Sequence, residues 1–124
     1  MIKTPITSES VVQRQLEAFN ARDLTALLSI YADDAELFEY PSKLVARGTE
    51  ELRARFSARF AEPNLLAKLV HRIVVGTTVI DHEIVTRTFP EGAGTLELVM
   101  IYEINEGRIA KAWSIPGEKR LAQN

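Results

Sequence analysis

The chain offers few side chains for acid–base chemistry, because it contains two histidines and no cysteine. Histidine titrates near neutral pH and often serves as a general acid or base. His82 stands between Asp81 and Glu83 in a run of β-branched residues, and Glu39 lies in an earlier short apolar run. A histidine and a carboxylate that meet across a cavity could transfer a proton, so His82 and Glu39 are the first candidates.

The spacing of apolar side chains predicts the elements that position these candidates. Helical spacing covers residues 8–22, a second segment that Asp23 caps, and a third that begins at Thr49 and ends near Pro63. Residues 36–40 indicate a short strand, and residues 41–48 indicate a loop.

Beyond Pro63 the pattern changes to four β-rich runs separated by glycine-containing turns. Three helices followed by a meander of four strands predict an α+β fold, with the helices packed on one face of an antiparallel sheet. The length of 124 residues is typical of one domain, and we expect a single domain over residues 1–124.

Composition excludes several classes of function. A net charge of −2 gives no electrostatic reason to bind nucleic acid or an anionic membrane. The first ten residues lack the apolar core of a signal peptide, and no apolar run approaches the length of a membrane span. Without cysteine there is no disulfide, and we expect a cytoplasmic protein that needs no metal or other cofactor. Arg53, Arg55 and Arg59 are interpreted as a solvated helix face, because glutamates are interleaved with them.

Turn geometry predicts which face of the sheet each residue occupies. Gly76 and Thr77 suit a two-residue turn, which pairs His71 with His82 and Arg72 with Asp81. The last turn, at residues 104–108, likewise predicts which residues of the final two strands pair and which face of the sheet each residue occupies.

The turn between residues 89 and 94 permits several registers. Placing like residues together puts Arg87 opposite Glu97 and directs His82 inward, whereas Asp81 and Glu83 point outward. The inner face then combines apolar side chains, a few polar groups and small residues in the last strand, the usual composition of a ligand pocket. The outer face carries an apolar patch with a charged rim, which predicts a homodimer through Val85, Val99, Ile101 and Trp113.

These faces define the predicted site. The predicted catalytic residues are Glu39, His82 and Tyr102. The predicted ligand-binding residues are Tyr31, Tyr40, His71, Ile84, Leu98, Met100, Ala112 and Ser114. Alternation along residues 36–40 leaves open whether Glu39 or Tyr40 faces the pocket, and a site in which Glu39 and both histidines share a metal ion is a further alternative.

The motifs "YADDAELFEYP", "ARGTEELRARF" and "EGRIAKAW", in this order among three helices and four strands, support a family resemblance. Over residues 8–115 the chain resembles the SnoaL-like and ketosteroid-isomerase-like branch of the nuclear transport factor 2 superfamily. This resemblance implies a cone-shaped α+β barrel with a deep pocket. Proteins of this superfamily often dimerise through the outer face of the sheet.

The resemblance specifies fold more strongly than function. The general-base aspartate of the ketosteroid isomerases matches Glu39, or Tyr40 if Pro41 is aligned instead. Their tyrosine and protonated aspartate, which bind the dienolate oxygen, match Gln15 and Met100 here. Because such donors stabilise the transition state by several kcal/mol, we do not expect authentic steroid isomerisation.

Two functions fit the sequence. The first is cofactor-free proton transfer of the isomerase, cyclase or dehydratase type on a small, largely apolar molecule, with Glu39 and His82 as acid–base groups and Tyr102 as hydrogen-bond donor. The second is a non-catalytic module on the same fold that binds a small ligand or forms a dimer.

Overall fold

The structure is a computed structural model that describes residues 6–122. In chain order the elements are α1 (Ser8–Ala21), α2 (Leu24–Ile30), β1 (Tyr31–Glu39), β2 (Lys43–Arg47), α3 (Gly48–Phe60), β3 (Leu66–Val75), β4 (Thr78–Phe89), β5 (Gly92–Asn105) and β6 (Arg108–Leu121). The predicted α+β class is therefore confirmed. The prediction about a signal peptide falls partly on residues 1–5, which lie outside the described residues.

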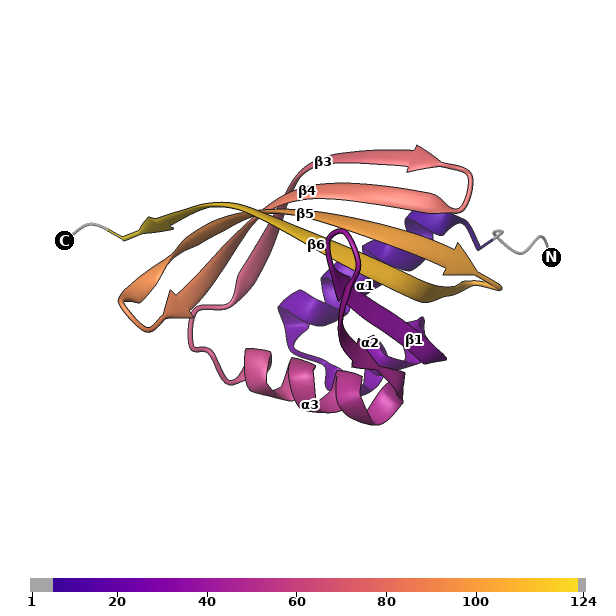
Figure 1. Ribbon diagram of the computed structural model, residues 1–124, viewed down its shortest axis with the longest axis horizontal. Helices are drawn as coiled ribbons and strands as arrows, with labels where there is room; N and C mark the ends of the chain where they lie inside the picture. Colours follow the sequence, from indigo (N-terminus) through magenta and orange to yellow (C-terminus); the bar gives the residue numbers. More distant parts are fainter. Residues whose placement is uncertain (1–5, 123–124) are drawn as a thin grey trace.

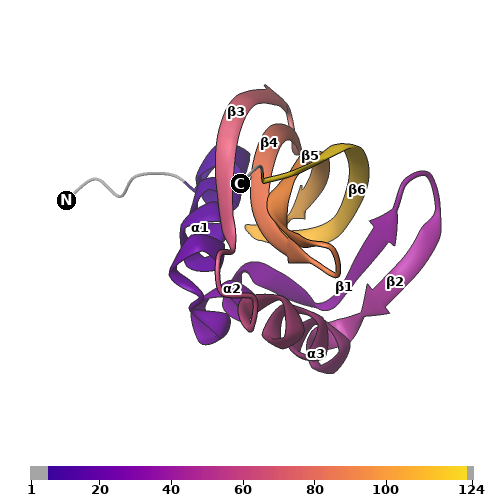
Figure 2. The ribbon, with the colours of Figure 1, turned by 90° about the vertical axis from the view of Figure 1, so that its left-hand side faces the viewer.

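The strands form one sheet in the order β2-β1-β6-β5-β4-β3. All neighbouring strands are antiparallel except β1 and β6, which run parallel. Figures 1 and 2 show the sheet curling around its concave side. Helix α1 packs against β3 and β4 on that side, and α3 packs against β1 and β2. The result is a half-cone whose interior lies between the sheet and the helices.

Local signals account for the helix ends. The Thr7 side chain accepts a hydrogen bond from the Ser10 backbone N–H, and the Ser10 side chain accepts one from the Thr7 backbone N–H, so α1 begins with a capping box. Asp23 caps α2 as predicted, through the Ala26 backbone N–H. The predicted cap of α3 at Thr49 is wrong, because that helix begins at Gly48 without a side-chain cap.

The predicted loop at residues 41–48 is also wrong, because most of it forms strand β2. Leu44 lies opposite Phe38 and Arg47 opposite Glu36, so these residues gain partners from β1. Strand β1 itself begins at Tyr31, earlier than the predicted strand at residues 36–40. Edge pairing of this kind depends on a distant neighbour and leaves little signal in the local sequence.

The predicted turn between β3 and β4 is correct. His71 lies opposite His82 and Arg72 opposite Asp81. Between Leu69 and His71 the register shifts, so Leu69 faces Glu83 and Val70 is the extra residue of a β-bulge.

The predicted register between β4 and β5 is wrong. Arg87 lies opposite Gly94, three positions from the predicted partner Glu97. Since side chains alternate between faces, an odd shift reverses every residue of β4 relative to β5. Asp81 and Glu83 therefore point inward and are buried, whereas His82 points outward and is partly exposed.

Leu98, Met100 and Tyr102 keep their predicted face, although each lies opposite a β6 residue two positions beyond the predicted one. Tyr102 lies opposite Ala112, and Met100 lies opposite Ser114. All four side chains are on the concave side of the sheet. An even shift leaves the faces unchanged, so these residues still point inward.

Helices α1, α2 and α3 and the concave sheet face share the main apolar core. Its fully buried side chains include Val11, Val12, Leu27, Val79 and Ile109. A smaller cluster around Leu16, Leu65, Ala67 and Val85 closes the β3 side. Within residues 6–122, no helix is long and apolar enough to cross a membrane.

Candidate functional site

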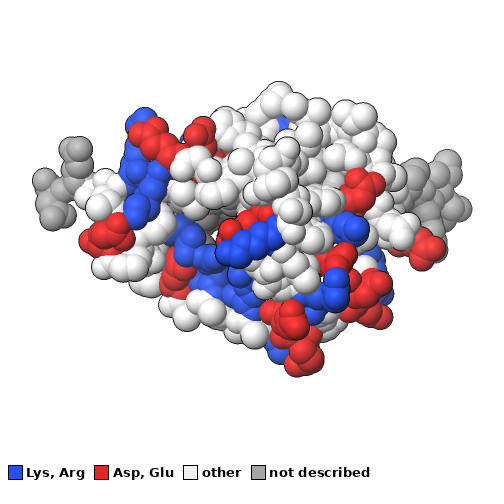
Figure 3. Space-filling view, viewed as in Figure 1, with Lys and Arg blue, Asp and Glu red and all other residues white. Residues whose placement is uncertain are grey.

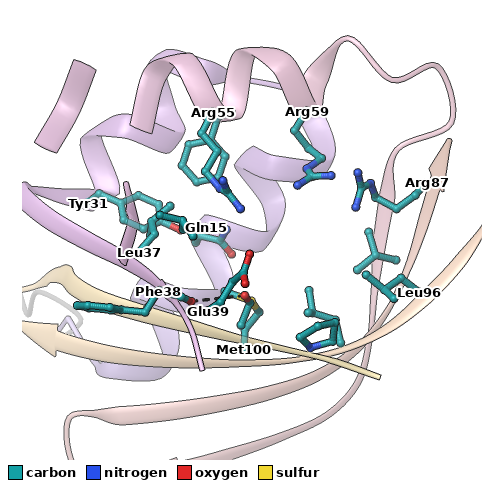
Figure 4. Close-up of a pocket in the computed structure, with 17 residues that line it drawn as sticks. Gln15, Tyr31, Leu37, Phe38, Glu39, Arg55, Arg59, Arg87, Leu96 and Met100 are labelled. Atoms are coloured by element: carbon teal, nitrogen blue, oxygen red, sulfur yellow. Dashed lines mark hydrogen bonds between the residues drawn. The ribbon is translucent and has the colours of Figure 1, made fainter. Parts of the chain in front are cut away.

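A cavity of about 280 Å³ opens on the concave side of the sheet, below α3 (Figure 4). Apolar side chains make most of its wall: Leu37, Val45, Phe56, Val85, Leu96, Leu98, Met100, Ala112 and Pro116. Small residues at the β6 positions Ala112 and Ser114 leave this volume open. A concave apolar space with a few polar groups is the usual form of a small-molecule site.

Glu39 enters this cavity from the end of β1. Its Cα lies opposite Ser114 of β6, in the parallel pair that joins β1 to the rest of the sheet. Its side chain is 48% exposed, and its nearest cation is Lys43 at 3.8 Å. Among the cavity-lining residues that the structure describes, Glu39 is the only carboxylate.

Two buried polar side chains, Gln15 and Tyr31, form the inner end of the cavity, and Tyr102 lies behind them. Gln15 of α1 donates a hydrogen bond through Nε2 to the Tyr31 hydroxyl at 3.4 Å. The Tyr102 hydroxyl donates to Gln15 Oε1 at 3.3 Å. Burial raises the pKa of both tyrosines, so both stay protonated and can act as donors. No described residue accepts a hydrogen bond from the Tyr31 hydroxyl, which leaves its proton free for a ligand.

Three arginines form the opposite side of the cavity. Arg55 and Arg59 come from α3 and Arg87 from β4, and Figure 4 shows their guanidinium groups entering the cavity above the apolar floor. Arg87 makes two hydrogen bonds of 2.8 Å to Glu62, which also accepts one of 3.3 Å from Arg59. Burial and the nearby Arg55 both lower the pKa of Arg59, although Glu62 opposes this.

Six of the predicted site residues line this cavity: Glu39, Tyr31, Leu98, Met100, Ala112 and Ser114. Glu39, rather than Tyr40, faces inward, which resolves the alternative that the sequence left open. The roles of these residues in catalysis or binding stay predictions.

Five predicted site residues lie elsewhere. His82, His71 and Ile84 point to the convex face, because the β4 register differs from the predicted one. Tyr40 is exposed beside a cis Tyr40–Pro41 peptide bond. Tyr102 is buried behind Gln15 and does not line the cavity.

On the convex face, His82 Nε2 lies 2.9 Å from Glu97 Oε2. Glu39 and the histidines are thus on opposite sides of the sheet, which rules out the alternative in which they share a metal ion. Across residues 6–122, no three His, Asp or Glu side chains gather as a possible metal site.

A second group of charges lies deeper in the concave face, away from the cavity. Arg72 binds Asp81 through two hydrogen bonds, of 2.7 and 3.0 Å, and also donates to Gln13 of α1. Glu83, two residues along β4, is 4% exposed. Burial and, to a lesser degree, the neighbouring Asp81 raise the pKa of Glu83 to about 7.

The sequence interpretation missed the three arginines and assigned Arg55 and Arg59 to a solvated face. One signal was present: Arg55 and Arg59 directly precede Phe56 and Phe60, two aromatic residues of the predicted apolar stripe. On a helix, a position next to that stripe lies at the border between core and solvent. Long arginine side chains at such a border can bend toward a cavity.

The fold is a cone-shaped α+β structure with a cavity between its curved sheet and its helices. The family model of the SnoaL-like domain matches residues 12–112, and the chain therefore belongs to the SnoaL-like family, as the resemblance predicted. A search of curated protein sequences gave no significant match.

Solved structures agree with this assignment. An uncharacterised cystatin-fold protein from Novosphingobium aromaticivorans has a TM-score of 0.81 at 25% identity, over 90% of this chain and 99% of its own. A proposed polyketide cyclase from Sinorhizobium meliloti has a TM-score of 0.70 at 23% identity, over 85% and 93%. The Δ5-3-ketosteroid isomerase from a Mycobacterium species has a TM-score of 0.74 at 18% identity, over 87% and 91%. The last two likenesses show the fold alone.

Proposed function

We propose that this protein catalyses cofactor-free proton transfer on a small, largely apolar carbonyl compound, in the manner of an isomerase or cyclase. The observation that carries the proposal is the position of Glu39 in the wall of an apolar cavity, facing polar donors at its inner end. A carboxylate base and a donor for the developing oxyanion are the two groups that enolisation requires.

Glu39 suits the role of base. Its side chain reaches the cavity, and the weak contact with Lys43 at 3.8 Å leaves its oxygens available. A carbonyl compound held on the apolar floor would present its α-carbon to this carboxylate, which removes the proton and can return it at another carbon.

Tyr31 and Gln15 replace the predicted donor Tyr102. The Tyr31 hydroxyl lines the cavity, and its hydrogen bond from Gln15 fixes its oxygen while leaving its proton free. Tyr102 holds Gln15 from behind and is therefore a positioning residue. Met100 lines the cavity and offers no O–H or N–H donor at the place that matches the isomerase aspartate, so the site differs from that of a steroid isomerase.

The test uses cyclohex-3-en-1-one, whose conversion to the conjugated enone requires α-proton removal and is followed by ultraviolet absorbance. We expect the protein to accelerate this reaction and Glu39→Gln to slow it by about 100-fold or more. Tyr31→Phe, which removes only the hydroxyl, should slow it by about 10- to 100-fold.

His82→Gln is the matched control, because His82 lies on the convex face. The rate of this variant should equal that of the unchanged protein. An unchanged rate in Glu39→Gln, or a large loss in His82→Gln, would contradict the proposal. Ligand binding without any turnover would instead support the second candidate, a non-catalytic binding module.

We also propose a homodimer through the convex sheet face. Val99, Ile101 and Trp113 lie there as predicted, whereas Val85 points inward to the cavity. Exposed apolar residues of β3 extend the patch: Leu66, Val70, Ile73 and Val75. Figure 3 shows that few charged side chains interrupt the surface over β3 and β4.

Sedimentation analysis of Ile73→Glu tests the dimer, because one buried charge per subunit should separate the copies. A variant that stays as associated as the unchanged protein would argue against this face. The cytoplasmic location stays a prediction.

A further inference from the structure

We propose that the natural ligand of the cavity carries a carboxylate on an apolar body, and that Arg55 and Arg59 bind this carboxylate at the mouth. The inference rests on the proposed function in that both use one cavity, and it adds the chemical class of the molecule. Three observations support it: the charge balance of the rim, the unused donors of two arginines, and the apolar wall below them.

The rim has an excess of positive charge. Among the described residues that line the cavity, three are arginines and one, Glu39, is a carboxylate. Glu62 pairs with Arg59 and Arg87 behind the rim, and Glu51 lies on the neighbouring groove of α3 without an ion pair to Arg55. Glu39 contacts Lys43 and lies within 4 Å of none of the three arginines. A monoanion at the mouth would therefore meet a site of opposite charge.

Glu62 has no capacity left for Arg55. Its two oxygens already accept two bonds from Arg87, one from Arg59 and one of 3.0 Å from the Thr88 backbone N–H. A carboxylate has about four acceptor sites, so these four bonds use them all. Glu62 thus holds Arg87 in place and neutralises Arg59 only in part.

Arg55 and Arg59 keep most of their donors. Within residues 6–122, Arg55 has no carboxylate within 4 Å and makes no side-chain hydrogen bond, although it lines the cavity. Arg59 uses one N–H in a single bond of 3.3 Å. The two residues are one helical turn apart on α3, so their guanidinium groups lie on the same side of the helix.

The wall below the rim is apolar. Phe56 of α3, Leu96 and Leu98 of β5, and Pro116 of β6 line the cavity beside the arginines. This arrangement suits an amphiphile whose charged end stays at the mouth and whose carbon skeleton enters the cavity. The planar guanidinium fork of Arg55 or Arg59 matches the two oxygens of a carboxylate.

The closing experiment measures binding of octanoate and octan-1-ol to the full chain by isothermal titration calorimetry. The two probes share a chain length and differ in the anionic head. We expect octanoate to bind at least about tenfold more tightly, and added NaCl to weaken octanoate alone. Octyl phosphate is the third probe, and tighter binding of octyl phosphate than of octanoate would overturn the carboxylate assignment.

Substitutions on α3 test whether its arginines supply the positive charge that binds the carboxylate. Arg55→Gln should weaken octanoate binding about tenfold and leave octan-1-ol binding unchanged, and Arg55→Lys should restore part of the loss. Arg53→Gln is the matched control on the same helix, because Arg53 contacts Glu50 and does not line the cavity. Its octanoate affinity should stay within about twofold of the unchanged protein.

Equal affinities for octanoate and octan-1-ol, or equal losses in Arg55→Gln and Arg53→Gln, would overturn the inference. Its failure is separable from failure of the proposed function, because binding is measured without turnover. Octanoate binding with no isomerisation of cyclohex-3-en-1-one would contradict the enzyme and support the ligand class. The reverse result would support the enzyme and overturn the ligand class.

Discussion

Arg72 and the pair Arg55–Arg59 both face the interior of the cone, but their surroundings differ. The Arg72 side chain is 8% exposed and is held by Asp81 through two hydrogen bonds, with α1 covering it. Arg55 is exposed at the mouth of the cavity without a carboxylate partner among the described residues, and Arg59 shares Glu62 with Arg87.

This difference separates a structural charge from a charge that can serve a ligand. A buried charge must be paired, since its desolvation is otherwise uncompensated. A charge at a cavity mouth is stabilised by water and can exchange that water for an anion.

The largest effect should follow from Asp81→Asn, which keeps the shape of the side chain and removes its charge. Arg72 would then lose the carboxylate that binds it through two hydrogen bonds and keep only the exposed Glu9, at 4.0 Å, as an ion-pair partner. We expect a loss of about 3–5 kcal/mol in the free energy of unfolding. Urea denaturation measures this loss. The double variant Arg72→Met/Asp81→Leu should recover most of it, because neither charge remains buried. If the double variant were less stable than Asp81→Asn, the Arg72–Asp81 pair would stabilise the fold by more than the neutralisation of two buried charges.

Glu83 should make stability depend on pH. Its pKa rises from 4.5 to about 7 on folding, so the folded chain holds this proton more tightly than the unfolded chain. Well below pH 4.5, Glu83 is protonated in both the folded and the unfolded chain, so no stability is lost there. As pH rises from 4.5 to 7 the unfolded state releases its proton first, and stability falls by roughly 1–3 kcal/mol in total.

Glu83→Gln should remove this fall. Denaturation of the unchanged protein and of Glu83→Gln at pH 4.5 and at pH 8 gives the slope of the free energy of unfolding against pH for each. Comparing the two slopes separates the titration of Glu83 from any pH-independent effect of the amide. Identical slopes in both proteins would mean that Glu83 does not carry the shift.

Arg59→Met should cost less, about 0.5–1 kcal/mol in the free energy of unfolding, because it removes one partly exposed ion pair and keeps an apolar side chain. Thermal unfolding measures the change. A loss as large as that of Asp81→Asn would erase the contrast between the two groups of arginines.

The smallest effect should come from His82→Gln. The His82–Glu97 contact is 2.9 Å, but both side chains are more than a third exposed and solvent screens the pair. For the monomer we expect a change within about 0.5 kcal/mol in the free energy of unfolding by the same denaturation assay. A larger change at concentrations where the chain dimerises would indicate that the proposed homodimer covers this pair.

The sequence predicted the fold wherever a local signal specified it. The capped helices, the turn at Gly76 and the inward faces of Met100 and Tyr102 followed from capping residues, a glycine and alternation. The β4–β5 register did not, because several turns fit between Phe89 and Gly94. Placing like residues opposite each other then chose the wrong register.

The candidate site was predictable in part for the same reason. Leu98, Met100, Ala112 and Ser114 were identified because an even shift in register leaves their faces unchanged. For Glu39 the sequence left Tyr40 as an alternative, and Tyr31 lies in β1, outside the strand predicted at residues 36–40. His82 was misplaced together with all of β4. Asp81 and Glu83 are buried because Arg72 and α1 cover them, and that packing depends on tertiary contacts rather than on a local pattern.

The position of β6 between β1 and β5 also has a consequence for folding kinetics. The β1–β2 hairpin joins the sheet only through β6, whose Ala112 pairs with Leu37 across a long stretch of chain. Contacts so distant in sequence form slowly, because loop closure must precede them. Until β6 docks, β1 and β5 each present an unpaired edge, which is a template for association with other chains. Refolding yield should therefore depend on protein concentration.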